Sequence, residues 1–341
     1  RSRGAAIDRA WAERPRVMAA FGPLALSSMW QQRFDDPDDL APFFAAGRAM
    51  GFERFELSHT HSAAALATIP PGTAIAAVHH PCPNDGPSAL RRGDDATAPG
   101  PAARARWLTA LRATIATAHH LGARAVCAHL GTAHDEGVRK AWFELHSRFQ
   151  AGQATSHRYV EARTALRDRL AAVEPAAVAR AADVLADVVG DLRAAGVALG
   201  VETGYHAWEL PTADGMRALL DAVEAAAPGA VVGPDAVVGA WLDTGHVGVQ
   251  QNLGVATFDG WFEAVAAAGG GRGGRWVGVH WHDAVGVRDH LAVGTGRLDL
   301  TTVAATLTGM GNRPSPCATV EVDWYLQPAE VEAGARWLAA R

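Results

Sequence analysis

Short apolar segments alternate along the chain with longer segments in which apolar residues recur at helical spacing. The short segments, such as "VALGVET" and "WVGVHWH", are apolar almost throughout. This pattern is typical of parallel strands that are buried on both faces of a sheet. The sequence predicts eight strands, at residues 17–26, 52–58, 74–80, 123–130, 197–203, 237–245, 276–282 and 317–322.

The segments between the strands predict helices, several of which open with Asp, Thr or Pro and close on Gly. Residues 61–72 leave room for only a short helix. Alternating strands and helices predict an α/β fold, a closed (β/α)₈ TIM barrel in a single domain spanning residues 1–341. An open doubly wound sheet is the alternative, but no GxGxxG motif follows the first strand. The other predicted helices lie at 36–51, 102–122, 157–195, 212–227, 257–269, 300–311 and 327–341.

Residues 131–156, after the fourth predicted strand, form a longer connection than a usual strand-to-helix loop. Two interpretations remain open for this insertion. It is a lid or rim over a site at the barrel mouth, or a surface insertion without a role in function.

Composition and charge narrow the possible partners. The formal net charge of −5 argues against nucleic acid as a partner, although a local basic groove is compatible with it. Three cysteines, an odd number without CxxC spacing, predict reduced thiols in a cytoplasmic protein. No uninterrupted apolar run reaches about 18 residues, so the sequence predicts no membrane span.

Ionisable side chains stand at the carboxyl ends of most predicted strands, where the active sites of TIM barrels lie. Glu202 and Glu321 are each flanked by valine, and a lone carboxylate buried there would be costly. Carboxylates that meet at one barrel mouth repel each other unless a cation lies between them. Oxygen ligands with one imidazole suit Mn²⁺, Mg²⁺ or Co²⁺, and further imidazoles favour Zn²⁺. The strand-end residues are His79, His129, Glu202, Asp243, His246, His280, His282 and Glu321.

The stretch "VHWHDAVGVRDHLAVGTG" holds three histidines and two aspartates. His280 and His282 are two residues apart on a predicted strand and therefore face the same side. We expect His280 to be a metal ligand and not a core histidine, whereas His282 contacts either the substrate or a ligand residue. Asp289 and His290 precede a glycine-rich turn at residues 293–296, where the backbone can approach a ligand closely.

Two further residues are candidates for contacts with a substrate. Trp208 follows Glu202 closely and could stack on a sugar ring, or pack in the core. Arg288 could bind a phosphate or carboxylate group, or be solvated in its loop.

Five motifs, "GVETGY", "LDTGH", "VHWHD", "DHLAVGTG" and "VEVD", resemble those of the xylose isomerase-like TIM-barrel superfamily. This superfamily contains sugar and sugar-phosphate isomerases and epimerases together with endonuclease IV-type enzymes. The resemblance implies one divalent cation (Mn²⁺, Mg²⁺, Co²⁺ or Zn²⁺) held by four residues, with His246 contacting the substrate. The two glutamates of the set would also act as acid and base. The implied ligands are Glu202, Asp243, His280 and Glu321.

The implied activity is isomerisation or epimerisation of a small carbohydrate, a sugar, sugar phosphate or keto-sugar. A proton next to a carbonyl is removed, and the cation stabilises the resulting enediolate. The same groups would also serve a keto-sugar lyase or dehydratase. Barrels of this type often pair through their rim loops, so we also expect that this chain can form a homo-oligomer.

An endonuclease IV-like zinc phosphodiesterase is the competing hypothesis, since that family binds three zinc ions through extra histidines. The candidates here are His79, His129, His246 and His290. The order Arg288-Asp289-His290 displaces the aspartate by one residue from the nuclease pattern. A barrel without catalytic activity that serves as a binding protein is a third possibility. Metal content separates the three: one ion per chain, three zinc ions, or none.

Overall fold

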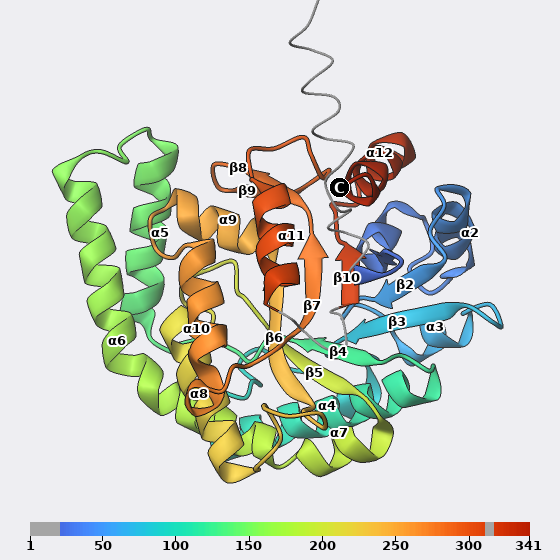
Figure 1. Cartoon of the computed structure of the whole chain (residues 1–341), viewed down its shortest axis with the longest axis horizontal. Coiled ribbons are helices and arrows are strands. Elements are labelled where there is room, and N and C mark those ends of the chain that lie inside the picture. Colours follow the sequence, from blue (N-terminus) through green and yellow to red (C-terminus); the bar gives the residue numbers. More distant parts are fainter. Residues whose placement is uncertain (1–20, 311–316) are drawn as a thin grey trace, which may run out of the picture.

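Eight parallel strands form a closed barrel in the computed structural model, which describes residues 21–310 and 317–341 (Figure 1). Each strand pairs with its neighbour in sequence, and the last pairs with the first. The predicted (β/α)₈ barrel is therefore confirmed. The strands are β1 (Ala25–Ser27), β2 (Arg54–Leu57), β3 (Ala74–His79), β4 (Ala125–Ala128), β5 (Ala198–Glu202), β6 (Val238–Asp243), β7 (Trp276–Trp281) and β10 (Cys317–Val320).

Seven of the predicted strands contain a barrel strand, and the first overlaps β1 by two residues, Ala25 and Leu26. The first predicted strand, residues 17–26, lies partly outside the described residues, and β1 begins near its end, at Ala25. The barrel strands are shorter than the predicted ones because residues at the ends of apolar segments lead into the loops.

Helices follow the strands and cover the outside of the barrel (Figure 1). Thr212 and Thr257 cap two of them by accepting a hydrogen bond from a backbone N–H in the first turn, as their sequence predicts. The predicted helix at 157–195 is wrong in one respect, because it is divided in two after Ala186. These helices are α2 (Ala41–Ala49), α3 (Ala63–Ala67), α4 (Pro101–His120), α6 (His157–Ala186), α7 (Val189–Ala195), α8 (Ala213–Ala226), α10 (Phe258–Gly271), α11 (Leu300–Gly309) and α12 (Pro328–Ala339).

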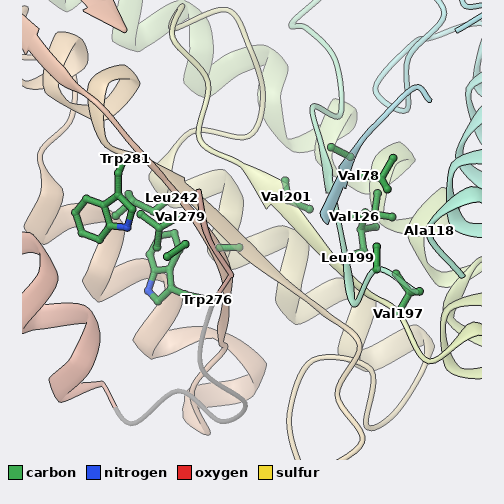
Figure 2. Close-up of a cluster of buried hydrophobic side chains, with 14 of the residues drawn as sticks. Val78, Ala118, Val126, Val197, Leu199, Val201, Leu242, Trp276, Val279 and Trp281 are labelled. Carbon is green, nitrogen blue, oxygen red and sulfur yellow. The ribbon is translucent and has the colours of Figure 1, made fainter. Parts of the chain in front are cut away.

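The apolar core lies mainly between the barrel and its helices. Leu199 and Val201 of β5 belong to this outer layer, together with Leu242 and Val279 of the next two strands (Figure 2). Because side chains alternate along a strand, the residues between and after them, including Glu202, face the barrel interior. Each fully buried aliphatic side chain contributes roughly 1.5–3 kcal/mol. The packing of the outer layer therefore fixes which polar residues point inward.

Trp241 of β6 fills the lower part of the barrel interior, where it packs with Ala77, Ala125 and Val277. Glycine makes room for its ring, since a Cβ atom on Gly278 would lie 2.3 Å from the indole. The barrel is thus closed by side chains below its mouth.

The insertion at 131–156 folds mainly into a helix, α5 (Glu136–Gln150), that lies beside α6 at one side of the barrel (Figure 1). Asp135 caps α5 by accepting a hydrogen bond from the N–H of Val138. Trp142 of α5 and Tyr159 of α6 belong to a second apolar cluster, separate from the main core. The role of this segment as a lid stays a prediction.

Two elements at the mouth were not predicted. Helix α9 (Thr244–Asn252) begins directly after β6, and β8 (Asp283–Val285) pairs with β9 (Arg288–Leu291) in a hairpin after β7. Two short 3₁₀ helices, η2 (Ser28–Arg33) and η3 (Gly86–Ser88), follow β1 and β3.

Over the described residues, no helix combines the length and the apolar character needed to cross a membrane. The three cysteines are free, and Cys82 and Cys127 are buried.

Candidate metal centre at the barrel mouth

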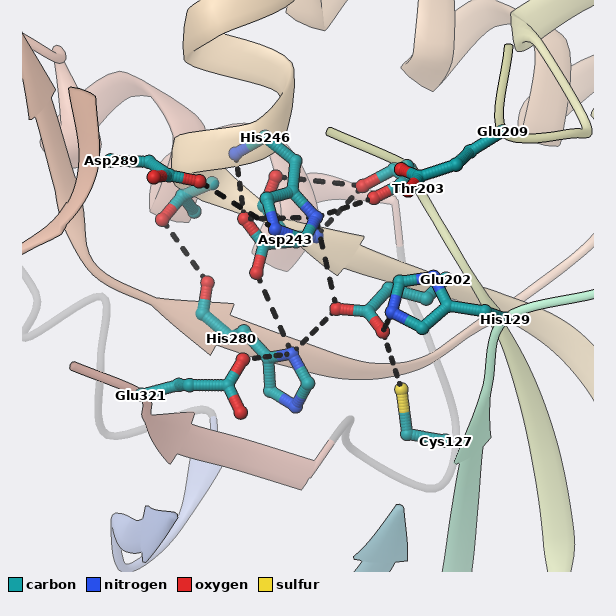
Figure 3. A network of polar contacts seen from close by, with 12 residues as sticks. Cys127, His129, Glu202, Thr203, Glu209, Asp243, His246, His280, Asp289 and Glu321 are labelled. Atoms are coloured by element: carbon teal, nitrogen blue, oxygen red, sulfur yellow. Dashed lines mark hydrogen bonds and ion pairs between the residues drawn. The ribbon is translucent and has the colours of Figure 1, made fainter. Parts of the chain in front are cut away.

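Four side chains from four consecutive barrel strands converge at the carboxyl ends of the strands (Figure 3). Each offers one oxygen or nitrogen atom, and these atoms all lie within 4.8 Å of one another. Nδ1 of His280 lies 2.8 Å from Glu202 Oε1, 3.0 Å from Glu321 Oε2 and, further away, 3.6 Å from an oxygen of Asp243. The structure therefore brings together the four residues that the sequence suggested as ligands.

The hydrogen bonding of His280 shows why a cation fits this position. Glu56 accepts a hydrogen bond from Nε2 of His280 at 2.8 Å. In the neutral imidazole, the lone pair of Nδ1 then faces the oxygens of Glu202 and Glu321. These groups are all acceptors, so they repel one another unless a proton or a cation lies between them. Three carboxylates and one imidazole form a donor set that Mn²⁺, Mg²⁺, Co²⁺ or Zn²⁺ accepts.

The surrounding charges also favour a positive centre here. Burial would lower the pKa of His280, but Glu321 and Glu56 raise it well above its usual value. Burial alone would raise the pKa of Asp243, but His246 and His282 lower it well below its usual value. Asp243 is therefore ionised at neutral pH, and its charge needs compensation inside the protein.

Glu56, which the sequence analysis missed, orients His280 from below. It lies on β2, is completely buried, and also accepts a hydrogen bond from Thr319 Oγ1 at 2.7 Å. A carboxylate on the second nitrogen of a metal-binding imidazole fixes the orientation of the ring and raises its basicity. Ser27, also missed, donates to Glu321 Oε1 at 3.0 Å and so holds the last carboxylate in place.

A second group of side chains contacts the other carboxylate oxygen of Glu202, Oε2. His79 Nε2 and His129 Nε2 are each 3.0 Å from Glu202 Oε2. Nδ1 of His79 donates to the backbone carbonyl of His80 at 3.1 Å, so the lone pair of Nε2 in a neutral ring faces the carboxylate. Burial would lower the pKa of His79, but Glu202 raises it to about 9. A proton or a second cation between His79 Nε2 and the carboxylate of Glu202 would remove the repulsion between these two acceptors. The thiol of Cys127, which is buried in β4, donates to the same oxygen at 3.3 Å.

A third group surrounds Asp243. The backbone N–H of His290 donates to Nδ1 of His282 at 2.7 Å, so the proton of His282 is on Nε2. That nitrogen donates to a carboxylate oxygen of Asp243 at 2.8 Å, which makes His282 a residue that positions Asp243. Nδ1 of His246 donates to the carbonyl of Thr203 at 2.9 Å. Nε2 of His246 is therefore the nitrogen left to accept a bond at the mouth.

Asp289 and His290, from hairpin strand β9, reach the same group. Asp289 Oδ2 lies 3.2 Å from His290 Nδ1 and 3.7 Å from His246 Nε2. The rings of His282 and His290 are stacked with centroids 4.2 Å apart. His290 has a φ of 51°, a left-handed conformation that a side chain other than glycine rarely adopts. The hairpin thus brings Asp289 and His290 to the mouth.

The contacts of Trp208 and Arg288 are with other residues. The indole of Trp208 stacks on His206 at 4.1 Å, and Phe143 of α5 approaches it at 5.0 Å. Arg288 is exposed and donates to the hydroxyl of Tyr325 at 2.7 Å. Their contacts with a substrate stay predictions. His59, another residue that the sequence analysis missed, has its ring 5.0 Å from that of His79.

Known proteins show the same architecture. The sequence matches no protein-family model and no curated protein. An L-ribulose 3-epimerase shares 18% identity over 92% of both chains, with a TM-score of 0.59. A xylose isomerase domain protein from Planctomyces limnophilus shares 16% identity over 86% of this chain and 89% of its own, with a TM-score of 0.51. The chain has the xylose isomerase-like barrel fold.

A third structure with this fold is the apo form of a 3-keto-D-glucoside 4-epimerase from E. coli. It shares 12% identity over 92% of this chain and 98% of its own, with a TM-score of 0.57. At these identities the similarity establishes the fold alone.

Proposed function

We propose that this protein is a divalent-metal-dependent isomerase or epimerase of a small carbohydrate, with Glu202 and Glu321 as its acid–base pair. The observation that carries the proposal is the pair itself. Oxygens of the two glutamates lie 2.8 and 3.0 Å from the same nitrogen of His280, at the mouth of the barrel. Interconversion of sugars at a carbon next to a carbonyl needs one group to remove a proton and another to return it.

A divalent cation would be held by Glu202, Asp243, His280 and Glu321. When bound there, it would polarise the carbonyl of the substrate and make the neighbouring proton easier to remove. Mn²⁺, Mg²⁺, Co²⁺ and Zn²⁺ all accept this set of ligands.

The protonation states of the two glutamates suit proton abstraction. Burial opposes ionisation of Glu202, but His129 and His280 lower its pKa well below the usual value. Burial also opposes ionisation of Glu321, but His280 keeps the pKa of Glu321 low. Both carboxylates are therefore ionised in the free protein, so either can remove the proton of the substrate, whereas the other returns a proton only after it has taken one up. Ser27 orients one of them and the thiol of Cys127 the other.

The comparisons support the substrate class that we propose. Structures with this fold include enzymes described as acting on a ketopentose and on a keto-glucoside. We therefore propose a ketose, a keto-glycoside or a sugar phosphate as the substrate. A keto-sugar lyase or dehydratase would start with the same proton abstraction.

The proposal is tested with the metal-loaded protein in D₂O. A panel of ketoses, keto-glycosides and sugar phosphates is incubated with it and followed by NMR. We expect deuterium to enter one substrate at the carbon next to the carbonyl, whether the product is an epimer, an isomer or an elimination product. Absence of exchange across the panel in protein that contains its metal contradicts the proposal.

A zinc phosphodiesterase is a second candidate, because the extra histidines are also assembled at the mouth. His79 and His129 lie at metal-ligand spacing from Glu202, and His246 and His290 lie at such spacing from Asp243, whereas both ring nitrogens of His282 are already hydrogen-bonded. Three zinc ions per chain, with hydrolysis of a phosphodiester, would establish this function. One ion per chain, without that hydrolysis, favours the isomerase or epimerase.

A further inference from the structure

A cavity opens at the amino ends of the barrel strands, opposite the mouth. Its volume is about 990 Å³. The floor of the barrel interior, including Ala125 and Val277, forms one wall, and the loop around Pro228 and Pro234 forms another. Trp241 packs against Ala125 and Val277, and its ring lies 5.0 Å from that of His280. The cavity is therefore separated from the metal centre by a packed layer.

Four arginines line this cavity, against a single aspartate, Asp235, among its described residues. They come from distant parts of the sequence: Arg54 begins β2, Arg124 precedes β4, Arg193 lies on α7 and Arg275 precedes β7. Within residues 21–310 and 317–341, none of the four forms an ion pair with a carboxylate. This concentration of positive charge therefore has no direct ion-pair partner within the described part of the chain.

Among the described residues, Arg275 has too few hydrogen-bond acceptors and no counter-charge. Its Nη1 donates to the carbonyl of Ala236 at 2.7 Å, but its Nε is buried and has no hydrogen-bond partner among the described residues. Burial lowers the pKa of this guanidinium, because a charged group loses its water without gaining a counter-charge. An anion in the cavity would supply both the missing acceptor and the missing charge.

Three of the arginines, Arg54, Arg124 and Arg275, line the cavity together with Cys317, at the start of β10. Burial and the charge of Glu56 raise the pKa of the Cys317 thiol to about 11, whereas these three arginines act in the opposite direction.

We propose that this cavity binds a small polyanion, a metabolite with phosphate or carboxylate groups, at a site independent of the metal centre. Arginine is suited to this ligand because its planar group of N–H donors matches the oxygens of phosphate and carboxylate. Phosphate and carboxylate share the chemistry that the arginines recognise, and separate arms of the test distinguish them.

The test is calorimetric titration of the metal-loaded protein at constant ionic strength. Inorganic phosphate and pyrophosphate form one arm and citrate the other. The test variants are Arg124→Gln and the double variant Arg124→Gln/Arg275→Gln. The matched control is Arg167→Gln, which removes the same charge from an exposed position on α6. Metal content and circular dichroism confirm that each variant is folded.

We expect saturable binding of one anion class, weakened about tenfold or more by Arg124→Gln and further by the double variant, but unchanged by Arg167→Gln. Binding of phosphate to the metal centre would be equal in all these proteins. Equal affinities in the wild type and both test variants therefore overturn the proposal, as does the absence of saturable binding by all three anions. Because Arg124 is exposed, its single variant keeps the test valid if the double variant does not fold.

Discussion

The orientation of His280 depends on Glu56, so Glu56→Gln tests the metal centre without touching a ligand. The amide keeps the shape of the side chain but removes the charge behind the imidazole. We expect the affinity for Mn²⁺ or Zn²⁺ to fall about 10- to 100-fold, measured by competition with a chelator, while the fold is kept. Unchanged affinity would show that Glu56 has only a structural role.

The two glutamates of the proposed acid–base pair make a second prediction at the scale of single residues. Glu202→Gln and Glu321→Gln should each lower turnover about 10²- to 10⁴-fold, because each variant loses a proton-transfer group and a ligand charge. Glu224→Gln is the matched control, since Glu224 is also buried but bonds to Gly229 and Val231, away from the mouth. Wild-type turnover in both test variants would refute the assigned roles.

The sequence indicated some of these residues and hid others for a physical reason. Glu202 and Asp243 end apolar segments, so both their burial and their position at the mouth could be predicted. Glu56 lies in "FERFEL", among other charged residues, and nothing in the pattern distinguishes it from an exposed glutamate. Its burial follows from the inward direction of alternate residues on β2. His59 follows the same strand and could have been found by the strand-end argument.

At the scale of elements, the ring of Trp241 on β6 fits against β7 because its partner there is a glycine, Gly278. Gly278→Ala places a Cβ atom 2.3 Å from the indole, so we expect a loss of about 1–3 kcal/mol in the free energy of unfolding. Gly190→Ala, in α7, is the control, because its Cβ atom would meet no atom within 4 Å. Urea denaturation measures both. Equal stability of the Gly278→Ala variant and wild type would contradict this account of the barrel interior.

Helices and strands could be predicted where the apolar pattern is long. They were missed where a local hydrogen bond determines that the element forms. Helix α9 begins because the side chain of Asp243 accepts a hydrogen bond from the N–H of His246, a cap that the apolar pattern does not show. The β8–β9 hairpin contains mostly polar residues and carries no strand pattern. Both elements carry or position residues of the mouth, so the architecture was more predictable than the detail of the site.

At the scale of the whole molecule, the candidate metal centre joins residues from four consecutive strands of the barrel, from β5 to β10. A cation bound there removes the repulsion between the carboxylates and should stabilise the entire fold. At a free concentration of about 100 times its Kd, the expected gain is about 2.7 kcal/mol. Thermal melting with and without a chelator measures it, and Glu321→Gln should reduce the gain. A melting temperature that is indifferent to metal would contradict a bound cation.

The stability of the fold should also depend on pH through buried neutral histidines, and His61 offers a direct test. Burial lowers the pKa of His61 to about 4 from an ordinary value of 6.5, with a smaller opposite effect of Asp38. Between these two values the unfolded chain binds a proton that the folded protein does not. Stability is therefore complete above pH 6.5 and decreases as the pH falls toward 4.

At pH 5, this one group should destabilise the protein by roughly 2 kcal/mol relative to pH 8. His61→Gln keeps a polar group for Ser28 Oγ, which lies 2.5 Å from Nε2 of His61, but it does not titrate. The free energy of unfolding of this variant should decrease less than that of wild type over the same pH range. Because every other titrating group is common to both proteins, the difference between the two curves isolates His61. Parallel curves would mean that His61 is protonated as readily in the folded protein as in the unfolded chain.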